Sequence, residues 1–141
     1  KKLSVFNTKT IGIRRNINNM PPYFAEMHTL DELNEQLPLA DVVVACMDGD
    51  ICGFAIPEYI ERQESCCRRA EKFCRISEFG VDAALRRRGA ASAMIDFCCT
   101  EAKKRKLERL EPDVWSFNRD AVRFCEAAGF ETYRQYMEVK P

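Results

Sequence analysis

The sequence predicts an α/β (α+β) fold, with a single mixed β-sheet flanked by helices. Three observations support this. Two apolar runs, 42–46 and 51–56, flank an Asp-Gly pair, which is typical of a β-hairpin. Apolar residues recur every three or four positions over 89–107 and again over 121–128, as in amphipathic helices. A strand-like run at 114–117 lies between these two helices.

Composition limits the classes of protein to consider. The 141 residues predict one domain, 1–141, and 46% apolar with 31% charged residues is typical of a globular chain. Lys plus Arg equals Asp plus Glu, 22 against 22, so we expect no nucleic-acid partner. The longest apolar run, 42–47, is too short to cross a bilayer, so no membrane association is expected. No signal-peptide pattern is visible, which predicts a cytoplasmic protein.

Local sequence patterns predict the remaining helices, strands and loops. We expect a strand at 3–6, a helix at 11–20 capped by Thr10, a helix at 32–37 capped by Asp31, a strand end followed by a loop over 57–69, a buried strand at 73–81 and a last strand at 132–139. Pro112 suits the start of the 114–117 strand, Asn118 is a good helix N-cap, and Gly129 suits a helix end.

Eight cysteines could in principle form disulfides or a metal site. The chain has no CxxC pair and His28 is its only histidine, so no zinc-type ligand set stands out. The adjacent pairs Cys66-Cys67 and Cys98-Cys99 are expected to point in different directions. We therefore expect reduced thiols that serve as small apolar side chains, and no metal.

The segment 81–91 carries the chemistry most clearly. A buried strand ends at Val81, and a helix opens near Gly89 after three consecutive arginines. Unpaired N–H groups at a helix N-terminus, small residues and nearby guanidinium groups suit a pyrophosphate. An exposed basic turn before an ordinary helix explains the same residues, and the turn alone does not decide between the two.

The wider pattern resembles the GNAT superfamily of acetyl-CoA-dependent N-acetyltransferases. Arg86, Gly89 and Ala91 match its phosphate loop, Arg/Gln-x-x-Gly-x-Gly/Ala, with a strand-end valine upstream. Downstream, the family pattern Asn-x-x-Ala-x-x-Phe-Tyr-x-x-x-Gly-Phe is matched over 118–130, with Cys125 in place of the tyrosine. The resemblance covers 41–138, and 1–40 corresponds to the variable acceptor-side helices.

The resemblance implies a splayed sheet whose two central strands separate to admit the pantetheine arm of acetyl-CoA. It implies cofactor-binding residues on the strand end, the phosphate loop and the last helix: Phe79, Val81, Arg86, Arg87, Arg88, Gly89, Ala90, Ala91, Ser92, Asn118 and Phe124. A main-chain N–H near Val81 would stabilise the tetrahedral oxyanion.

Three residues are candidate catalytic groups. Cys125 takes the position of the tyrosine that commonly protonates the leaving thiolate in the family, and helix-core packing is its alternative role. Tyr136 could supply that proton instead. Glu78 is a candidate base; alternation places it opposite Phe79 and on the same face as Ile76, where a structural role is the alternative.

The sequence thus predicts an N-acetyltransferase that moves acetyl from acetyl-CoA to a primary amine within a ternary complex. Two other classes stay open, a non-catalytic acyl-CoA-binding module and a purely structural domain with a solvated arginine turn. The acceptor is not specified; His28 and Trp115 could line its pocket, although an exposed histidine and a packed tryptophan are commoner. A homodimer is compatible with the resemblance, and no residue pattern decides the oligomeric state.

Overall fold

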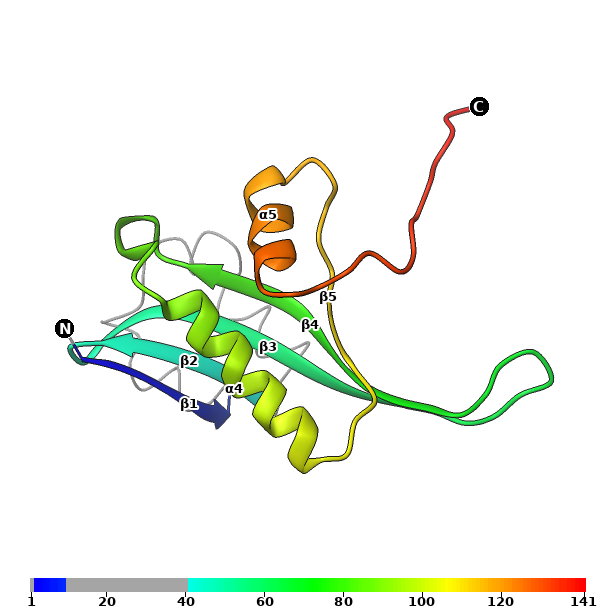
Figure 1. The fold of residues 1–141 in the computed structure, drawn as a ribbon, viewed down its shortest axis with the longest axis horizontal. Helices are drawn as coiled ribbons and strands as arrows, with labels where there is room; N and C mark the ends of the chain where they lie inside the picture. Colours follow the sequence, from blue (N-terminus) through cyan, green and yellow to red (C-terminus); the bar gives the residue numbers. More distant parts are fainter. Residues whose placement is uncertain (1, 10–40) are drawn as a thin grey trace.

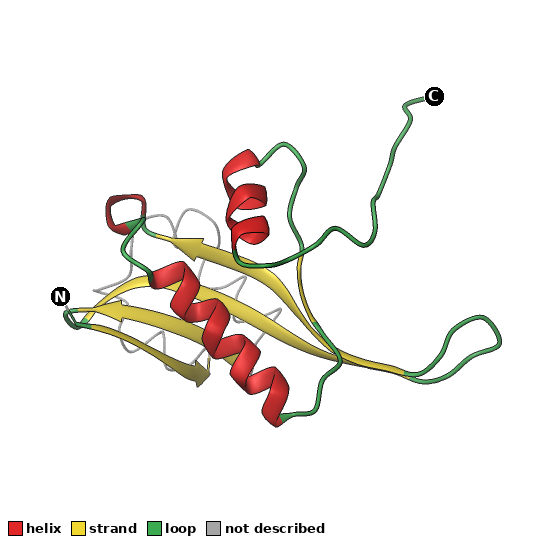
Figure 2. Ribbon diagram, viewed as in Figure 1, coloured by secondary structure: helices red, strands yellow, loops and turns green. Residues whose placement is uncertain are grey.

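The computed structural model describes residues 2–9 and 41–141. Its elements, in chain order, are β1 (Leu3–Lys9), β2 (Asp41–Met47), β3 (Asp50–Arg62), β4 (Glu71–Val81), the short 3-10 helix η2 (Ala83–Leu85), α4 (Ala90–Lys104), β5 (Leu110–Pro112) and α5 (Arg119–Ala127). Figures 1 and 2 show α4 lying across one face of the sheet, with α5 beside the end of β4. The helices expected at 11–20 and 32–37, and His28, lie outside the described residues.

The five strands form one sheet in the order β1-β2-β3-β4-β5. The first four are antiparallel neighbours and β5 is parallel to β4, which confirms the predicted mixed sheet flanked by helices. The β2–β3 turn is the predicted hairpin. Asp48 and Gly49 have φ angles of 55° and 92°, and two positive values are what a type I′ turn requires.

The helix α4 packs closely on the sheet. Its buried residues are Ala90, Met94, Ile95, Cys98 and Ala102, and they join strand residues in one apolar cluster. A glycine in β3 permits this contact, because a Cβ on Gly53 would lie 2.9 Å from Cε of Met94 and 3.0 Å from the carbonyl oxygen of Gly80. The opposite face carries a second buried cluster, formed by Val42, Val44, Cys46, Phe54 and Ile56.

A β-bulge interrupts β4 at Ser77. Successive β3 residues face Glu78 and then Ile76, so Ser77 has no residue opposite it, and its hydroxyl donates to the carbonyl oxygen of Ile56 at 3.3 Å. The extra residue reverses the alternation, so Ile76 and Phe79 both pack with the cluster beneath α4. Glu78 pairs with Ile56 of the other cluster. The expectation that Glu78 shares a face with Ile76 is therefore wrong.

The strands β4 and β5 are neighbours over only a short distance. Residues 74–76 pair with 110–112, and one further hydrogen bond joins the N–H of Asp113 to the carbonyl oxygen of Ile76 at 3.4 Å. Beyond that point β4 continues to Val81, while the chain after β5 turns away toward α5 (Figure 1). The sheet is splayed at this end, as predicted.

The strand expected at 114–117 is wrong. The observed strand is Leu110–Pro112, and Pro112 ends it rather than starting it. Residues 114–117 form a turn in which Trp115 and Phe117 are exposed and stack on each other, with ring centroids 5.7 Å apart. Their apolar side chains are typical of a strand, but β4 has already separated from the chain at this point and does not pair with them.

The hairpin of β3 and β4 is much longer than expected. The segment 57–69 was predicted to be a strand end and a loop, but β3 continues to Arg62 and β4 begins at Glu71. Pairing runs from Glu58 opposite Arg75 out to the last residues of the two strands, whereas β2 pairs with β3 only as far as Ala55. The outer part of the hairpin therefore projects beyond the sheet as a two-stranded arm (Figure 1).

The helix α5 ends as predicted, but the chain after it differs. Gly129 has a φ of 91°, its N–H donates to the Glu126 carbonyl, and the N–H of Phe130 donates to the Cys125 carbonyl, which is a Schellman C-cap. The strand expected at 132–139 is wrong, because residues 131–141 have no regular secondary structure and are exposed. No helix of the described chain has both the length and the apolar character needed to cross a bilayer.

All eight cysteines are free thiols. Cys46, Cys52, Cys74 and Cys98 are buried in the core, as expected for small apolar side chains. The pair Cys66-Cys67 is different. Both thiols are exposed at the tip of the arm and their sulfurs are 3.5 Å apart, so the expectation that they point in different directions is wrong.

Candidate functional site

The turn between β4 and α4 is held by hydrogen bonds from its own side chains to its backbone. The carboxylate of Asp82 accepts the N–H of Ala84 at 2.9 Å and caps η2. The Nε of Arg86 donates to the carbonyl oxygen of Val81 at 3.3 Å, which folds the turn back on the strand end. Arg87 has a φ of 61°, so the backbone reverses directly before the helix.

The N-terminus of α4 is open. Its N-cap is Gly89, with a φ of 86°, and among the described residues no side chain caps the helix. The first N–H groups of the helix therefore point outward without a side-chain acceptor, at the positive end of the helix dipole. Ala90 is buried and anchors the turn, whereas the Ser92 hydroxyl is exposed beside these N–H groups.

Positive charge surrounds this helix start. Arg86, Arg87 and Arg88 are all exposed, and α4 has no acidic residue in its first turn. The partial charge of the helix and the three guanidinium groups have the same sign, so the turn is suited to an anion with several oxygens. The Asp82 carboxylate caps η2 rather than α4, so it leaves the first N–H groups of α4 available to a ligand.

An aromatic contact spans the splayed end of the sheet. The rings of Phe79 on β4 and Phe124 on α5 stack with their centroids 5.9 Å apart and their planes 24° apart. Both side chains pack against the main core cluster, as does Val81. The side-chain oxygen of Asn118 accepts the N–H of Ala121 at 3.3 Å, so this residue is the N-cap of α5, as predicted.

The three candidate catalytic residues lie in different surroundings. Cys125 is half-buried on α5, and burial, followed by the nearby charge of Glu126, raises the pKa of its thiol. Glu78 is half-buried on the sheet face opposite Phe79. Tyr136 is 84% exposed in the segment after α5, where the guanidinium of Arg134 lies 4.8 Å from its ring centroid. The structure therefore does not bring these three side chains together.

A buried carboxylate, Glu111, holds the point where β4 and β5 separate, and the sequence analysis missed it. Glu111 is only 8% exposed and lies opposite Arg75 in the parallel pair. Arg75 donates to one of its oxygens at 2.9 Å, and Arg109 donates to the other at 3.0 Å. The Tyr133 hydroxyl also bonds the second oxygen, which ties the chain after α5 to this cluster.

Aromatic packing surrounds the same charges. The guanidinium carbons of Arg62, Arg75 and Arg109 lie 5.1, 5.6 and 4.1 Å from the ring centroid of Phe73, which is fully buried. Burial tends to raise the pKa of Glu111, but hydrogen bonds from Tyr133, Arg75 and Arg109 outweigh it and lower that pKa. The cluster is thus an ionised, well-satisfied clasp directly below the splay.

One of these features had a signal in the sequence, and the other had none. Ile76 and Phe79 are three residues apart in one strand, a spacing that strict alternation would place on opposite faces and that the bulge at Ser77 returns to one face. Glu111 had no such signal, because its partners lie 36 residues upstream and 22 residues downstream, as well as at Arg109 just before its strand.

Comparison with known proteins supports a common family. Residues 13–130 match the Acetyltransferase (GNAT) family. At the level of whole sequences, no curated protein matches the chain.

Solved structures share the fold at low sequence identity. The BH1408 protein from Bacillus halodurans, in a tetramutant form, has a TM-score of 0.79 at 15% identity, covering 98% of this chain and 99% of that one. A ribosomal-protein-alanine N-acetyltransferase from Brucella melitensis biovar Abortus 2308 has a TM-score of 0.76 at 15% identity and 99% coverage of both chains. The aminoglycoside N-acetyltransferase AAC(6')-Iy, solved with CoA, has a TM-score of 0.72 at 14% identity and 98% coverage of both chains.

Proposed function

Because the chain belongs to the Acetyltransferase (GNAT) family, we propose that it transfers acetyl from acetyl-CoA to a primary amine, with both substrates bound at once. One observation carries the proposal more than any other. The open N-terminus of α4, with its three exposed arginines, lies next to the end of β4 that has separated from β5. An anion site and a gap between parallel strands are the two features that a phosphate-bearing thioester requires.

The donor is proposed to bind along this end of the sheet. Its diphosphate accepts hydrogen bonds from N–H groups between Arg86 and Ser92, because these precede or open α4 and have no side-chain cap. Its pantetheine arm enters between the diverging strands and lies along β4 near Phe79 and Val81. Phe124 then closes the other wall, since its ring already contacts that of Phe79.

The chemistry follows from positioning and from stabilisation of charge. A neutral amine attacks the thioester carbonyl, and the oxyanion needs an N–H donor. Main-chain groups at the end of β4 fill this role, because the bulge at Ser77 re-aims the strand there. The CoA thiolate then leaves and takes a proton.

Cys125 is the favoured source of that proton. Its raised pKa keeps the thiol protonated at neutral pH, which suits a proton donor and makes it a poor nucleophile. Tyr136 is less suited, because its side chain is almost fully exposed beyond α5. Glu78 can act as a base only for an acceptor that approaches from the face opposite Phe79.

The acceptor is proposed to be a primary amine of a small polycationic molecule or of a peptide N-terminus. These two classes are suggested by the names of two structural neighbours, an aminoglycoside N-acetyltransferase and a ribosomal-protein-alanine N-acetyltransferase. An assay of thiol release from acetyl-CoA should therefore test an aminoglycoside, a peptide with N-terminal alanine, and an amine-free control.

Donor binding can be tested with a charge-matched pair of variants. Arg87→Gln with Arg88→Gln removes two exposed cations at the start of α4, and Lys103→Gln with Lys106→Gln removes two exposed cations at its far end. We expect the first variant to weaken CoA binding in calorimetry about 10- to 100-fold, at about 0.7–1.4 kcal/mol for each exposed guanidinium removed, and the second to leave it unchanged. Equal losses in both variants would refute a specific phosphate site.

One alternative function is separated by the same experiments. A module that binds acyl-CoA without transfer would show the arginine-dependent binding but no thiol release with any amine. The replacement of tyrosine by Cys125 is the observation that favours this alternative. Failure of CoA to bind at all would refute both proposals.

A further inference from the structure

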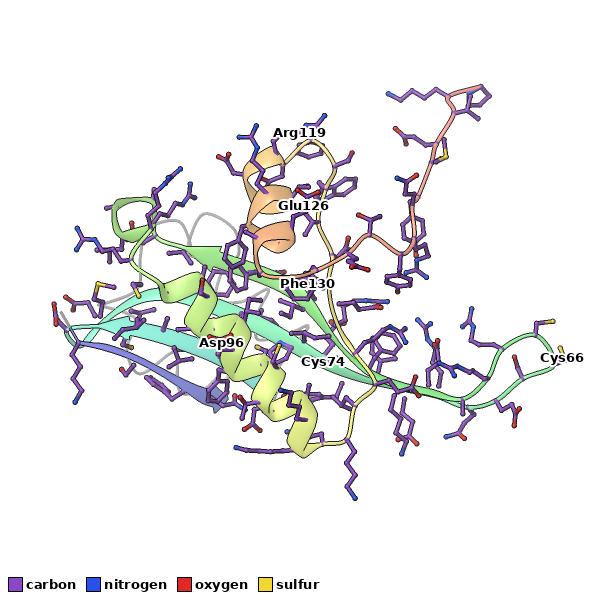
Figure 3. All side chains as sticks on the ribbon, viewed as in Figure 1. Cys66, Cys74, Asp96, Arg119, Glu126 and Phe130 are labelled. Carbon is purple, nitrogen blue, oxygen red and sulfur yellow. The ribbon has the colours of Figure 1, made fainter. Side chains whose placement is uncertain are left out.

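The arm of β3 and β4 ends in a tight turn that places two thiols side by side. Ser65 and Arg68 form an isolated bridge, with N–O distances of 2.8 and 3.2 Å, and Cys66 and Cys67 are the two residues between them. Both are exposed, and their sulfurs are 3.5 Å apart. Figure 3 shows Cys66 at the far end of the arm, well away from Cys74 at its base.

These are also the most accessible thiols of the chain. Of the other six, Cys46, Cys52, Cys74 and Cys98 are buried, and Cys99 and Cys125 are half-buried. Burial raises the pKa of Cys74 to about 11 and that of Cys98 to about 12, which keeps them protonated and unreactive. A thiol-seeking reagent therefore meets the arm tip first.

The spacing of the two sulfurs favours chelation of one atom over a disulfide. Adjacent Cα atoms are about 3.8 Å apart across a trans peptide, below the range of about 4.4–6.8 Å found for disulfides. If both sulfurs bound one soft atom at about 2.3 Å, their 3.5 Å separation would give a sulfur–atom–sulfur angle of about 99°. That angle suits a pyramidal or tetrahedral centre and excludes a linear one, which needs the sulfurs about 4.6 Å apart.

We propose that Cys66 and Cys67 form a dithiol site for trivalent organic arsenicals. With an arylarsenoxide, two S–H bonds break and two As–S bonds form, and the arsenic-bound oxygen leaves with both protons as one water. Arsenic stays trivalent and keeps its aryl carbon as the third ligand, so the step needs no oxidant or reductant. Thiolate and thiol sulfur are the soft ligands that such a centre prefers.

The proposal can be tested with phenylarsine oxide and native protein. Intact-mass spectrometry should show one phenylarsenic adduct per chain, retained against excess monothiol and released by a dithiol. Cys66→Ser and Cys67→Ser should each weaken retention roughly 100-fold or more, because the second As–S bond forms within the molecule. Cys99→Ser is the matched control, since it alters the other adjacent pair, on α4, and should behave like the native chain.

The alternatives give different results. Retention unchanged in Cys66→Ser or Cys67→Ser, or an adduct mapped to another cysteine, would overturn the proposal. Several adducts per chain would also overturn it, because they would show that buried thiols had opened. CoA binding should be the same in both serine variants, which makes this test independent of the proposed transferase activity.

Discussion

The clasp at Glu111 predicts a large and pH-dependent contribution to stability. Glu111→Gln keeps the shape of the side chain but removes the charge that Arg75 and Arg109 share. Removing one partner of a buried ion pair costs about 3–5 kcal/mol. Both arginine side chains are over a quarter exposed, 27% and 29%, so water replaces part of the loss and we expect about 2–3 kcal/mol.

The assay is urea denaturation followed by circular dichroism, with an unchanged m-value as evidence of the same unfolding transition. Glu108→Gln is the matched control. Its partner Arg69 is 3.4 Å away, and the Arg69 and Glu108 side chains are 81% and 41% exposed, so we expect a change below about 0.5 kcal/mol.

The pH dependence gives a second check on the same variant. The pKa of Glu111 is lowered in the folded protein, so its stabilising effect is present above the ordinary carboxyl pKa of about 4.3. The effect is lost as the pH falls through the lower, folded-state pKa. The difference between the native chain and Glu111→Gln should therefore shrink in acid. A difference near zero at pH 7, or one that does not change with pH, would refute the reasoning.

Three further predictions concern the proposed site. Gly89→Ala and Gly49→Ala both place a Cβ on a glycine with positive φ and open space around it, so each should cost about 1–2 kcal/mol in urea denaturation, but only Gly89→Ala should weaken CoA binding in calorimetry. Cys125→Ala should lower the rate of thiol release and remove a fall in rate at alkaline pH, because the raised pKa keeps the donor protonated below that range; an unchanged pH profile would assign Cys125 to packing. Asn118→Ala should cost about 1 kcal/mol by removing the cap of α5, whereas Asn118→Asp should retain most of the stability, as thermal melting would show.

The sequence predicts the parts of this fold that local chemistry determines. The Asp48-Gly49 turn, the Gly129 C-cap and the apolar stripe of α4 each follow from the conformational preferences of a few neighbouring residues. The start of α4 near Gly89 was likewise anticipated from the glycine itself.

The features that were missed depend on contacts between distant residues. The length of β3 was underestimated because the charged residues Glu58, Glu61 and Arg62 interrupt its apolar pattern, and this outer part pairs with β4 alone. The segment 132–139 has strand-like residues, but its described contacts are side-chain contacts with Glu111 of β5 and with Arg109 and Arg134, and not main-chain pairing with a strand. The Glu111 clasp is built from residues of three separate segments, so no local sequence pattern predicts it.

The bulge at Ser77 acts as a phase shift within a single strand. Before the bulge, residues 74–76 of β4 pair with β5, and the even-numbered Ile76 faces α4. After the bulge, the side chains that face α4 are at odd-numbered positions, such as Phe79. A one-residue deletion there would restore strict alternation and turn the terminal four residues of the strand over, moving Phe79 away from Phe124. The inserted residue thus lies directly after the last β4 residue that pairs with β5 and directly before the part of the strand that brings Phe79 beneath α4.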